Sequence, residues 1–121
     1  MWFRGALLAL GVALAFISPT KAVQAQEITF EITNDFRRDI QVEFYSQNRR
    51  HAWPGGNRAY NLNRGDTQTY RLACQRGEKV CYGGWVKGDA RTYWGVGLNG
   101  KYSCDSCCQI CGQGNLRKTL N

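Results

Sequence analysis

The stretch ITFEITNDFRRDIQVEFY, residues 28–45, decides the fold class because apolar and polar side chains alternate along it. The alternation runs from Ile28 to Thr33, stops in a polar segment, and resumes from Ile40 to Tyr45. Successive side chains of a strand point to opposite faces, so this period of two indicates strands with one buried face. These residues predict two half-buried antiparallel strands with a turn between them.

Similar alternating segments follow, and turn residues at positions 54–56 and at Gly77 separate them. Together the short strands predict an all-β fold, a small antiparallel β-sandwich or barrel that occupies residues 26–97. The four further strands are expected at residues 59–62, 67–74, 80–87 and 91–98.

The composition excludes several other classes of protein. The 121 residues include 14 glycines, which excludes a coiled coil or a helical repeat, and 12% aromatic residues, which is too many for a disordered chain. A chain of this length has room for one small hydrophobic core. Its formal net charge of +7 favours anionic partners.

Residues 1–25 have the pattern of a cleaved signal peptide. Arg4 precedes an apolar run at residues 5–17, and Val23 and Ala25 place small side chains before the expected cleavage site. The apolar run is short for a permanent membrane anchor, and no second apolar run follows it. We therefore expect a secreted or periplasmic protein that does not contact the membrane after cleavage.

Six cysteines follow the expected signal peptide, and an even number in a small exported chain is typical of a disulfide framework. Four of them fall in residues 98–114, which are expected to form a disulfide-bonded cap on the same domain, and residues 115–121 are expected to be a frayed tail. The expected disulfide cysteines are Cys74, Cys81, Cys104, Cys107, Cys108 and Cys111.

The spacing of the cysteines leaves the pairing open. Cys107 and Cys108 are not expected to pair with each other, because a disulfide between neighbours strains the peptide between them. Cys74 and Cys81 either form one bridge across a hairpin or each join the C-terminal cluster. A metal or redox site built on Cys104–Cys111 is an alternative, because C-x-x-C spacing also suits thiolate ligands and redox pairs.

Aromatic residues outside the predicted core are the main indication of function. By strand parity Tyr45, Trp85 and Tyr93 fall opposite the apolar face, unless a bulge near Gly83-Gly84 returns Trp85 to the inside. Rings beside cationic side chains suit stacking on sugars or contact with an anionic polymer. The leading hypothesis is a non-enzymatic binding module for glycans or anionic surfaces, and its predicted face comprises Tyr45, Arg71, Trp85, Lys87, Arg91 and Tyr93.

A second hypothesis is a protein-interaction or inhibitor domain that uses the loop at residues 46–57. There Trp53 would insert into a partner protein, and Arg49, Arg50 and His51 would supply a positive surface. Nucleic acid is not an expected partner, because no recognised binding motif accompanies the sequence pI of about 9.3. One histidine and the absence of a known catalytic motif argue against an enzyme, and no cofactor or metal is expected.

Two resemblances accompany these expectations. The segment TFEITN at residues 29–34, with residues 40–46 and 62–65, is similar to the opening of thaumatin-like β-sandwiches, which begin with a T-F-x-I-x-N strand. This resemblance implies a sandwich fold and polysaccharide binding, and it covers the N-terminal part of the domain. As a type, the chain also resembles small exported cysteine-rich proteins of Gram-negative bacteria. Neither resemblance transfers a functional residue to this chain.

Overall fold

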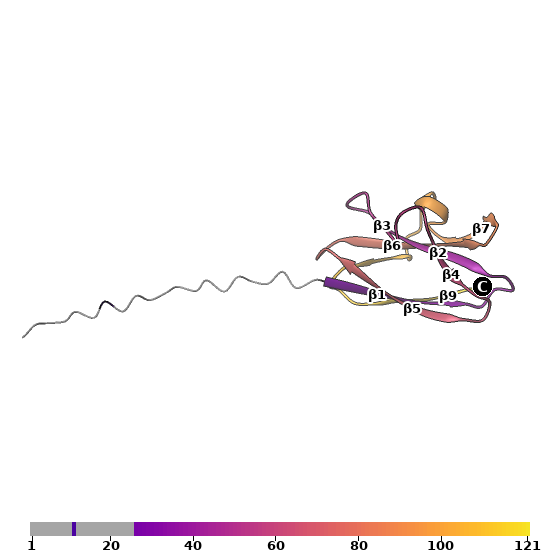
Figure 1. Cartoon of the computed structure of the whole chain (residues 1–121), viewed down its shortest axis with the longest axis horizontal. Helices are drawn as coiled ribbons and strands as arrows, with labels where there is room; N and C mark the ends of the chain where they lie inside the picture. Colours follow the sequence, from indigo (N-terminus) through magenta and orange to yellow (C-terminus); the bar gives the residue numbers. More distant parts are fainter. Residues whose placement is uncertain (1–10, 12–25) are drawn as a thin grey trace, which may run out of the picture.

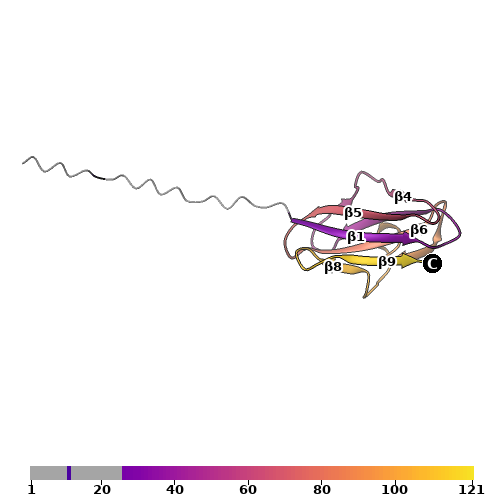
Figure 2. The ribbon, with the colours of Figure 1, turned by 90° about the horizontal axis from the view of Figure 1, so that it is seen from below.

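Two β-sheets face each other in the computed structural model, which describes residue 11 and residues 26–121 (Figure 1). The predicted signal peptide lies outside the described residues apart from Gly11. The three-stranded sheet has the order β5 (Thr67–Cys74), β1 (Gln26–Asn34), β9 (Leu116–Leu120). Figure 2 shows β1 and β9 from the side of this sheet.

The second sheet has six strands, and its main path runs β3-β2-β6-β7. The remaining two strands attach to this path, β4 beside β2 and β8 beside β6, and the 3₁₀ turn η1 (Leu98–Gly100) follows β7. The strands of this sheet are β2 (Ile40–Ser46), β3 (Ala52–Trp53), β4 (Tyr60–Leu62), β6 (Lys79–Val86), β7 (Asp89–Gly95) and β8 (Cys108–Ile110).

The predicted all-β sandwich is confirmed, and the alternating positions form its core. Ile28 and Phe30 of β1 are buried against Val42 and Phe44 of β2, and the rings of Phe30 and Phe44 lie 4.7 Å apart. The two strands therefore contribute to opposite sheets and do not pair with each other. All ladders in the described residues are antiparallel except that between β1 and β9.

A buried asparagine fixes the turn between the first two strands. The side-chain amide of Asn34 donates hydrogen bonds to the carbonyls of Arg38 and Leu62, at 2.9 and 3.0 Å, and its Oδ1 accepts the N–H of Phe36. Because all these partners are backbone groups, the turn and the neighbouring strand β4 are joined at one point. This pairing explains how a fully buried polar side chain is accommodated.

The predicted frayed tail at residues 115–121 is wrong, because residues 116–120 form β9 in parallel with β1. Leu120 is 1% exposed, and its carbonyl accepts the N–H of Asp35. Gly84 makes room for it, since a Cβ at that position would lie 3.1 Å from the Leu120 side chain. The C-terminus is thus part of the core.

All six cysteines form disulfides, as the sequence predicted, and two of the three bridges join the C-terminal segment to the sandwich. Cys74 of β5 pairs with Cys111 and Cys81 of β6 pairs with Cys108, so each joins the C-terminal cluster and no hairpin bridge forms. The third disulfide, Cys104–Cys107, closes a short ring within the predicted cap. Cys74–Cys111 connects the two layers, because β5 belongs to one sheet and Cys111 follows β8 of the other.

The described residues include no helix that is long and apolar enough to cross a membrane.

Candidate ligand-binding groove

The outer face of the six-stranded sheet, turned away from the three-stranded sheet, contains the three aromatic residues that strand parity selected. Tyr45 pairs with Cys81 across β2 and β6, and Trp85 of β6 lies between Gln41 and Tyr93. The inward positions on the same strands are occupied by core residues such as Phe44. Trp85 therefore remains on the outer face, and the register irregularity between β6 and β7 occurs after it.

Position on the outer face does not make Trp85 accessible, and its predicted role as an exposed ring is wrong. Trp85 is 5% exposed, and its Nε1 donates to the side-chain oxygen of Gln41 at 3.2 Å. The segment after β7 folds back over this face. Its Gly97 lies so close to Gly83 that a Cβ added to Gly83 would be 2.2 Å from the Gly97 carbonyl oxygen. Tyr93, by contrast, is 39% exposed.

The cations predicted to accompany these rings are separated in space, so the six predicted residues do not form one face. Arg71 lies on β5, in the other sheet. Lys87 lies in the turn after β6, in a hollow with Arg37, Arg38, Asp39 and Arg64. Arg91 is on β7, the same strand as Tyr93, and forms an ion pair with Asp89 at 3.0 Å.

The loop at residues 46–57 does not present Trp53 to a partner, so that part of the second hypothesis is wrong. Trp53 is 8% exposed in β3, and its Nε1 donates to the carbonyl of Ala73 at 3.0 Å. His51 packs edge-on against this ring at 4.4 Å, and the Arg49 guanidinium lies 5.7 Å from its centre. The indole is an internal support for the loop rather than an anchor.

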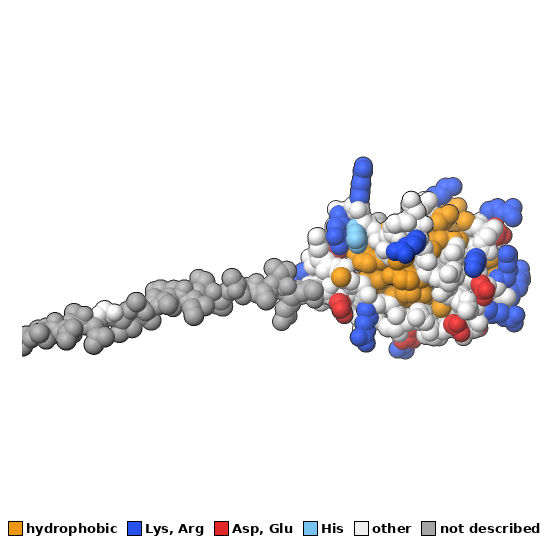
Figure 3. All heavy atoms as spheres, in the orientation of Figure 1, with side chains coloured by type: hydrophobic (Ala, Val, Ile, Leu, Met, Phe, Trp, Pro, Cys, Tyr) orange, Lys and Arg blue, Asp and Glu red, His pale blue; other side chains and the backbone are white. Residues whose placement is uncertain are grey.

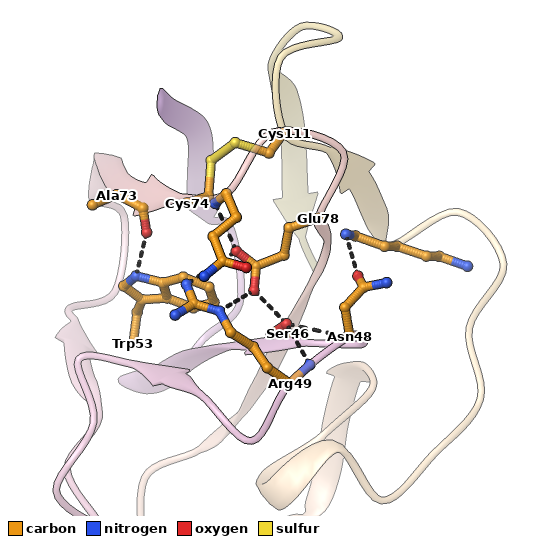
Figure 4. A network of polar contacts seen from close by, with 10 residues as sticks. Ser46, Asn48, Arg49, Trp53, Ala73, Cys74, Glu78 and Cys111 are labelled. Atoms are coloured by element: carbon orange, nitrogen blue, oxygen red, sulfur yellow. Dashed lines mark hydrogen bonds and ion pairs between the residues drawn. A yellow bond between two sulfur atoms is a disulfide. The ribbon is translucent and has the colours of Figure 1, made fainter. Parts of the chain in front are cut away.

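A buried carboxylate holds the loop against the sandwich (Figure 4). The Glu78 side chain, 1% exposed, accepts two hydrogen bonds from Arg49, one from the Ser46 hydroxyl and one from the Gln75 N–H. Burial alone would raise the pKa of Glu78, but these donors outweigh burial and lower the pKa to about 2. The carboxylate is therefore ionised at neutral pH, and its contacts with Arg49 and Ser46 hold the loop.

Between this fixed loop and η1 lies an open groove of about 750 Å³. Glu43 and Tyr45 of β2 line its sheet side, and Asn99 and Gly100 line it from η1. A smaller hollow beside Trp85 continues it, since Glu43 and Asn99 line both. We call the two together the groove. Its polar and aromatic lining residues include Glu43, Tyr45, Arg50, His51, Asn57, Arg58, Trp85 and Asn99.

Polar groups in the groove are fixed by hydrogen bonds to one another. The Tyr45 hydroxyl donates to Glu43 Oε1 at 2.7 Å and accepts the Asn99 N–H at 2.8 Å. Burial raises the pKa of Tyr45 above its ordinary value, and Glu43 raises it further, so the hydroxyl remains a donor at neutral pH. Among the described residues only Glu43 Oε1, and not Oε2, accepts a side-chain hydrogen bond.

The groove has a positive rim. Arg50 and Arg58 are exposed, and neither takes part in an ion pair with another described residue. His51 is exposed beside Arg50, and Figure 3 shows the histidine among Lys and Arg side chains. Glu43 is the one carboxylate among the described lining residues, so the cations outnumber it.

Cysteine chemistry does not contribute to this site. All six cysteines are in disulfides, which leaves no thiolate for the metal alternative at Cys104–Cys111. No group of three or more metal-ligating side chains occurs in residues 26–121. The disulfide between Cys81 and Cys108 instead links the segment after β7 covalently to β6.

Sequence reasoning found Tyr45 and the basic loop but missed Glu43, Asn57 and Asn99. Asn57 and Asn99 have positive φ values of 58° and 59°, a conformation that asparagine adopts more readily than most residues. The pair Gly83-Gly84 was the available signal, because two residues without side chains in a strand indicate close approach of other backbone. The two glycines predict that another segment covers this face, but they do not identify that segment.

Neither a family model, nor a curated protein, nor a solved structure matches this chain. The resemblance to thaumatin-like sandwiches stays a prediction. The fold and the site define a disulfide-bonded β-sandwich with a positively rimmed groove on the outer face of one sheet.

Proposed function

We propose that this protein is an exported, non-enzymatic binding domain that holds an acidic glycan in the groove. The observation that carries the proposal is the presence of two arginines without acidic partners, Arg50 and Arg58, around the Glu43–Tyr45 pair. Guanidinium groups bind carboxylates and sulfates through paired N–H donors. Carboxylate and amide groups, here those of Glu43, Asn57 and Asn99, suit sugar hydroxyls, which both donate and accept hydrogen bonds.

Export is supported by two independent features. Residues 1–25 have the charge and apolar pattern of a signal peptide, and all six cysteines of the remaining chain are disulfide-bonded. Disulfides persist in oxidising compartments, where cell-surface and extracellular acidic polysaccharides are also found. The proposed ligand and the proposed location are therefore consistent with each other.

Binding without catalysis is supported by the arrangement of carboxylates. Most glycoside hydrolases use two carboxylates on either side of the bond that they cleave. Among the described residues that line the groove, Glu43 alone supplies one, and its Oε1 already accepts the Tyr45 hydroxyl. Glu78, which holds the loop, does not line the groove and is paired with Arg49.

The test is the affinity of the exported protein for polygalacturonate, a polymer of carboxylated sugars, measured by titration calorimetry at low and high salt. Arg58→Glu is expected to weaken binding at least ten-fold, since hydrogen bonds to charged groups contribute about 1.5–3 kcal/mol and about 1.4 kcal/mol is ten-fold. Arg71→Glu is the matched control, because it makes the same charge change on the other sheet.

Equal losses of affinity in the Arg58→Glu and Arg71→Glu variants would contradict the proposal. The net charge of the protein, and not the groove, would then explain the binding. Absence of binding by the unmodified protein would contradict it as well. Binding that weakens as salt rises, with Arg58→Glu much more affected than Arg71→Glu, supports it.

A further inference from the structure

We propose that the groove is one half of a longer site, and that its ligand is a linear acidic oligosaccharide of several sugar units rather than a single sugar. This inference rests on the proposed function and deepens it. The second half is a hollow on the other side of η1, which we call the tyrosine hollow. Its lining residues used here are Asp89, Arg91, Leu98, Asn99, Lys101 and Tyr102.

The two halves meet at η1. Leu98 and Asn99 line both the tyrosine hollow and the part of the groove beside Trp85, and Asn99 also lines the main part of the groove. The tyrosine hollow has a volume of about 780 Å³, close to that of the main groove. One asparagine thus contacts all three hollows, and an extended ligand could pass along it from one to the next.

One side chain that lines the tyrosine hollow is aromatic, and aromatic rings stack on sugar rings. Tyr102 lines it, and the ring of Tyr93 stacks on Tyr102 with centroids 3.8 Å apart and an interplanar angle of 6°. Tyr93 and Leu98, at 39% and 37% exposed, are the exposed large hydrophobic residues of the described chain. Hydrophobic side chains also gather near η1 and β7 in Figure 3.

Cations lie in both halves of the site. The groove has Arg50 and Arg58, and the tyrosine hollow has Arg91 and Lys101. Asp89 also lines the tyrosine hollow, but its ion pair with Arg91 leaves Lys101 without an acidic partner among the described residues. Lys101 Nζ lies 5.7 Å from the centre of the Tyr102 ring, so charge and aromatic surface are adjacent.

The strand order sets the length of the site. Its lining residues come from β3, β2, β6 and β7, which are successive neighbours in the sheet. Strands are about 4.8 Å apart, so three intervals span about 14 Å. One sugar ring is shorter than this span. A ligand that contacts cations in both halves must therefore be a chain of sugars with repeated negative charges.

The experiment measures affinity for galacturonate oligomers of defined length, from disaccharide to octasaccharide, by titration calorimetry on the exported protein. We expect affinity to rise at least ten-fold from the disaccharide to the hexasaccharide and then to level off. The double variant Arg91→Ser, Lys101→Ser is expected to lose most of that gain while its affinity for the disaccharide stays unchanged. Arg58→Ser is expected to weaken the binding of every length.

The matched control is the double variant Arg71→Ser, Arg117→Ser on the three-stranded sheet. Like the tested pair, it removes one exposed cation and one cation held in an ion pair, since Arg117 pairs with Glu31. We expect it to keep the full gain with length. The substituted side chains are all exposed, and amide NMR spectra check that the fold is retained.

Four results would overturn the inference. Affinity independent of length, or a gain that the Arg91, Lys101 variant keeps, would restrict the ligand to the groove and leave the proposed function intact. Absence of binding at every length would contradict the proposed function itself. Polyglutamate bound as tightly as a galacturonate oligomer of equal charge would show that the site does not recognise sugar.

Discussion

Glu78 holds the loop that forms one wall of the groove. The substitution Glu78→Gln tests how much the charge of this side chain stabilises the fold. The carboxylate is buried and accepts hydrogen bonds from Arg49, Ser46 and the Gln75 N–H (Figure 4). A glutamine has the same shape but no charge, and its NH₂ group would face these donors. The substitution therefore removes the electrostatic part of the network with little change in packing.

The size of the effect follows from the pKa of Glu78. A shift of one unit corresponds to about 1.4 kcal/mol, so a fall from 4.5 to about 2 corresponds to about 3 kcal/mol of stability. The Arg49 side chain is 35% exposed, and water screens part of this interaction. We therefore expect Glu78→Gln to lower the free energy of unfolding by about 2 kcal/mol at pH 7.

The stability that Glu78 contributes should decrease at acidic pH. Because the folded pKa lies below the unfolded value, the stabilisation is fully present above about pH 4.5 and is lost as the pH falls toward 2. The assay is equilibrium unfolding in urea with the disulfides intact, repeated from neutral pH down to about pH 2.5. The difference in stability between the natural protein and the variant should shrink across that range.

The control is Glu31→Gln, whose carboxylate is 34% exposed and pairs with Arg117 on the surface. Exposed ion pairs contribute about 0–1 kcal/mol, so this variant should lower stability by less than about 1 kcal/mol. A Glu78→Gln variant that loses no more than the control at pH 7 would refute the reasoning. So would a difference that stays constant from pH 7 to pH 3.

Four further variants test the fold by the same unfolding assay. A disulfide that closes a longer loop restricts the unfolded chain more. Replacing Cys81 and Cys108 with alanine should therefore lower stability by about 3–4 kcal/mol, and replacing Cys104 and Cys107 by about 2 kcal/mol, because the two bridges span 27 and 3 residues. Equal losses would contradict this dependence on loop length. Gly83→Ala should lower stability by about 1–3 kcal/mol, because the new Cβ would meet the Gly97 oxygen, and an unchanged value would show that the segment after β7 does not cover the sheet. Leu120→Ala should lower stability by about 2–5 kcal/mol, whereas a frayed C-terminus would show no loss.

The buried faces of the strands could be predicted because alternation is local information. The period of two alone predicts that Ile28, Phe30, Val42 and Phe44 share a buried face, and all four are buried in the core. The pairing of strands and cysteines depends on contacts between distant segments, which spacing does not encode. Leu120 was missed for the same reason, because a five-residue strand with mixed polarity becomes recognisable only beside β1.

The candidate site shows where strand parity stops being informative. Parity placed Trp85 correctly on the outer face, but its exposure depends on whether another segment covers that face. The covering segment contains Gly97 and Asn99, which contribute backbone and no periodic apolar side chains. Asn99 therefore gave no signal in the sequence, although it lines all three hollows.

The most direct test of the binding site is an NMR titration of the isotope-labelled exported protein with hexagalacturonate. Our account predicts that the largest backbone amide shifts occur at Glu43, Asn57 and Asn99, with smaller shifts at Lys101. Shifts confined to the outer face of the three-stranded sheet around Arg71, or no shifts at saturating ligand, would contradict it.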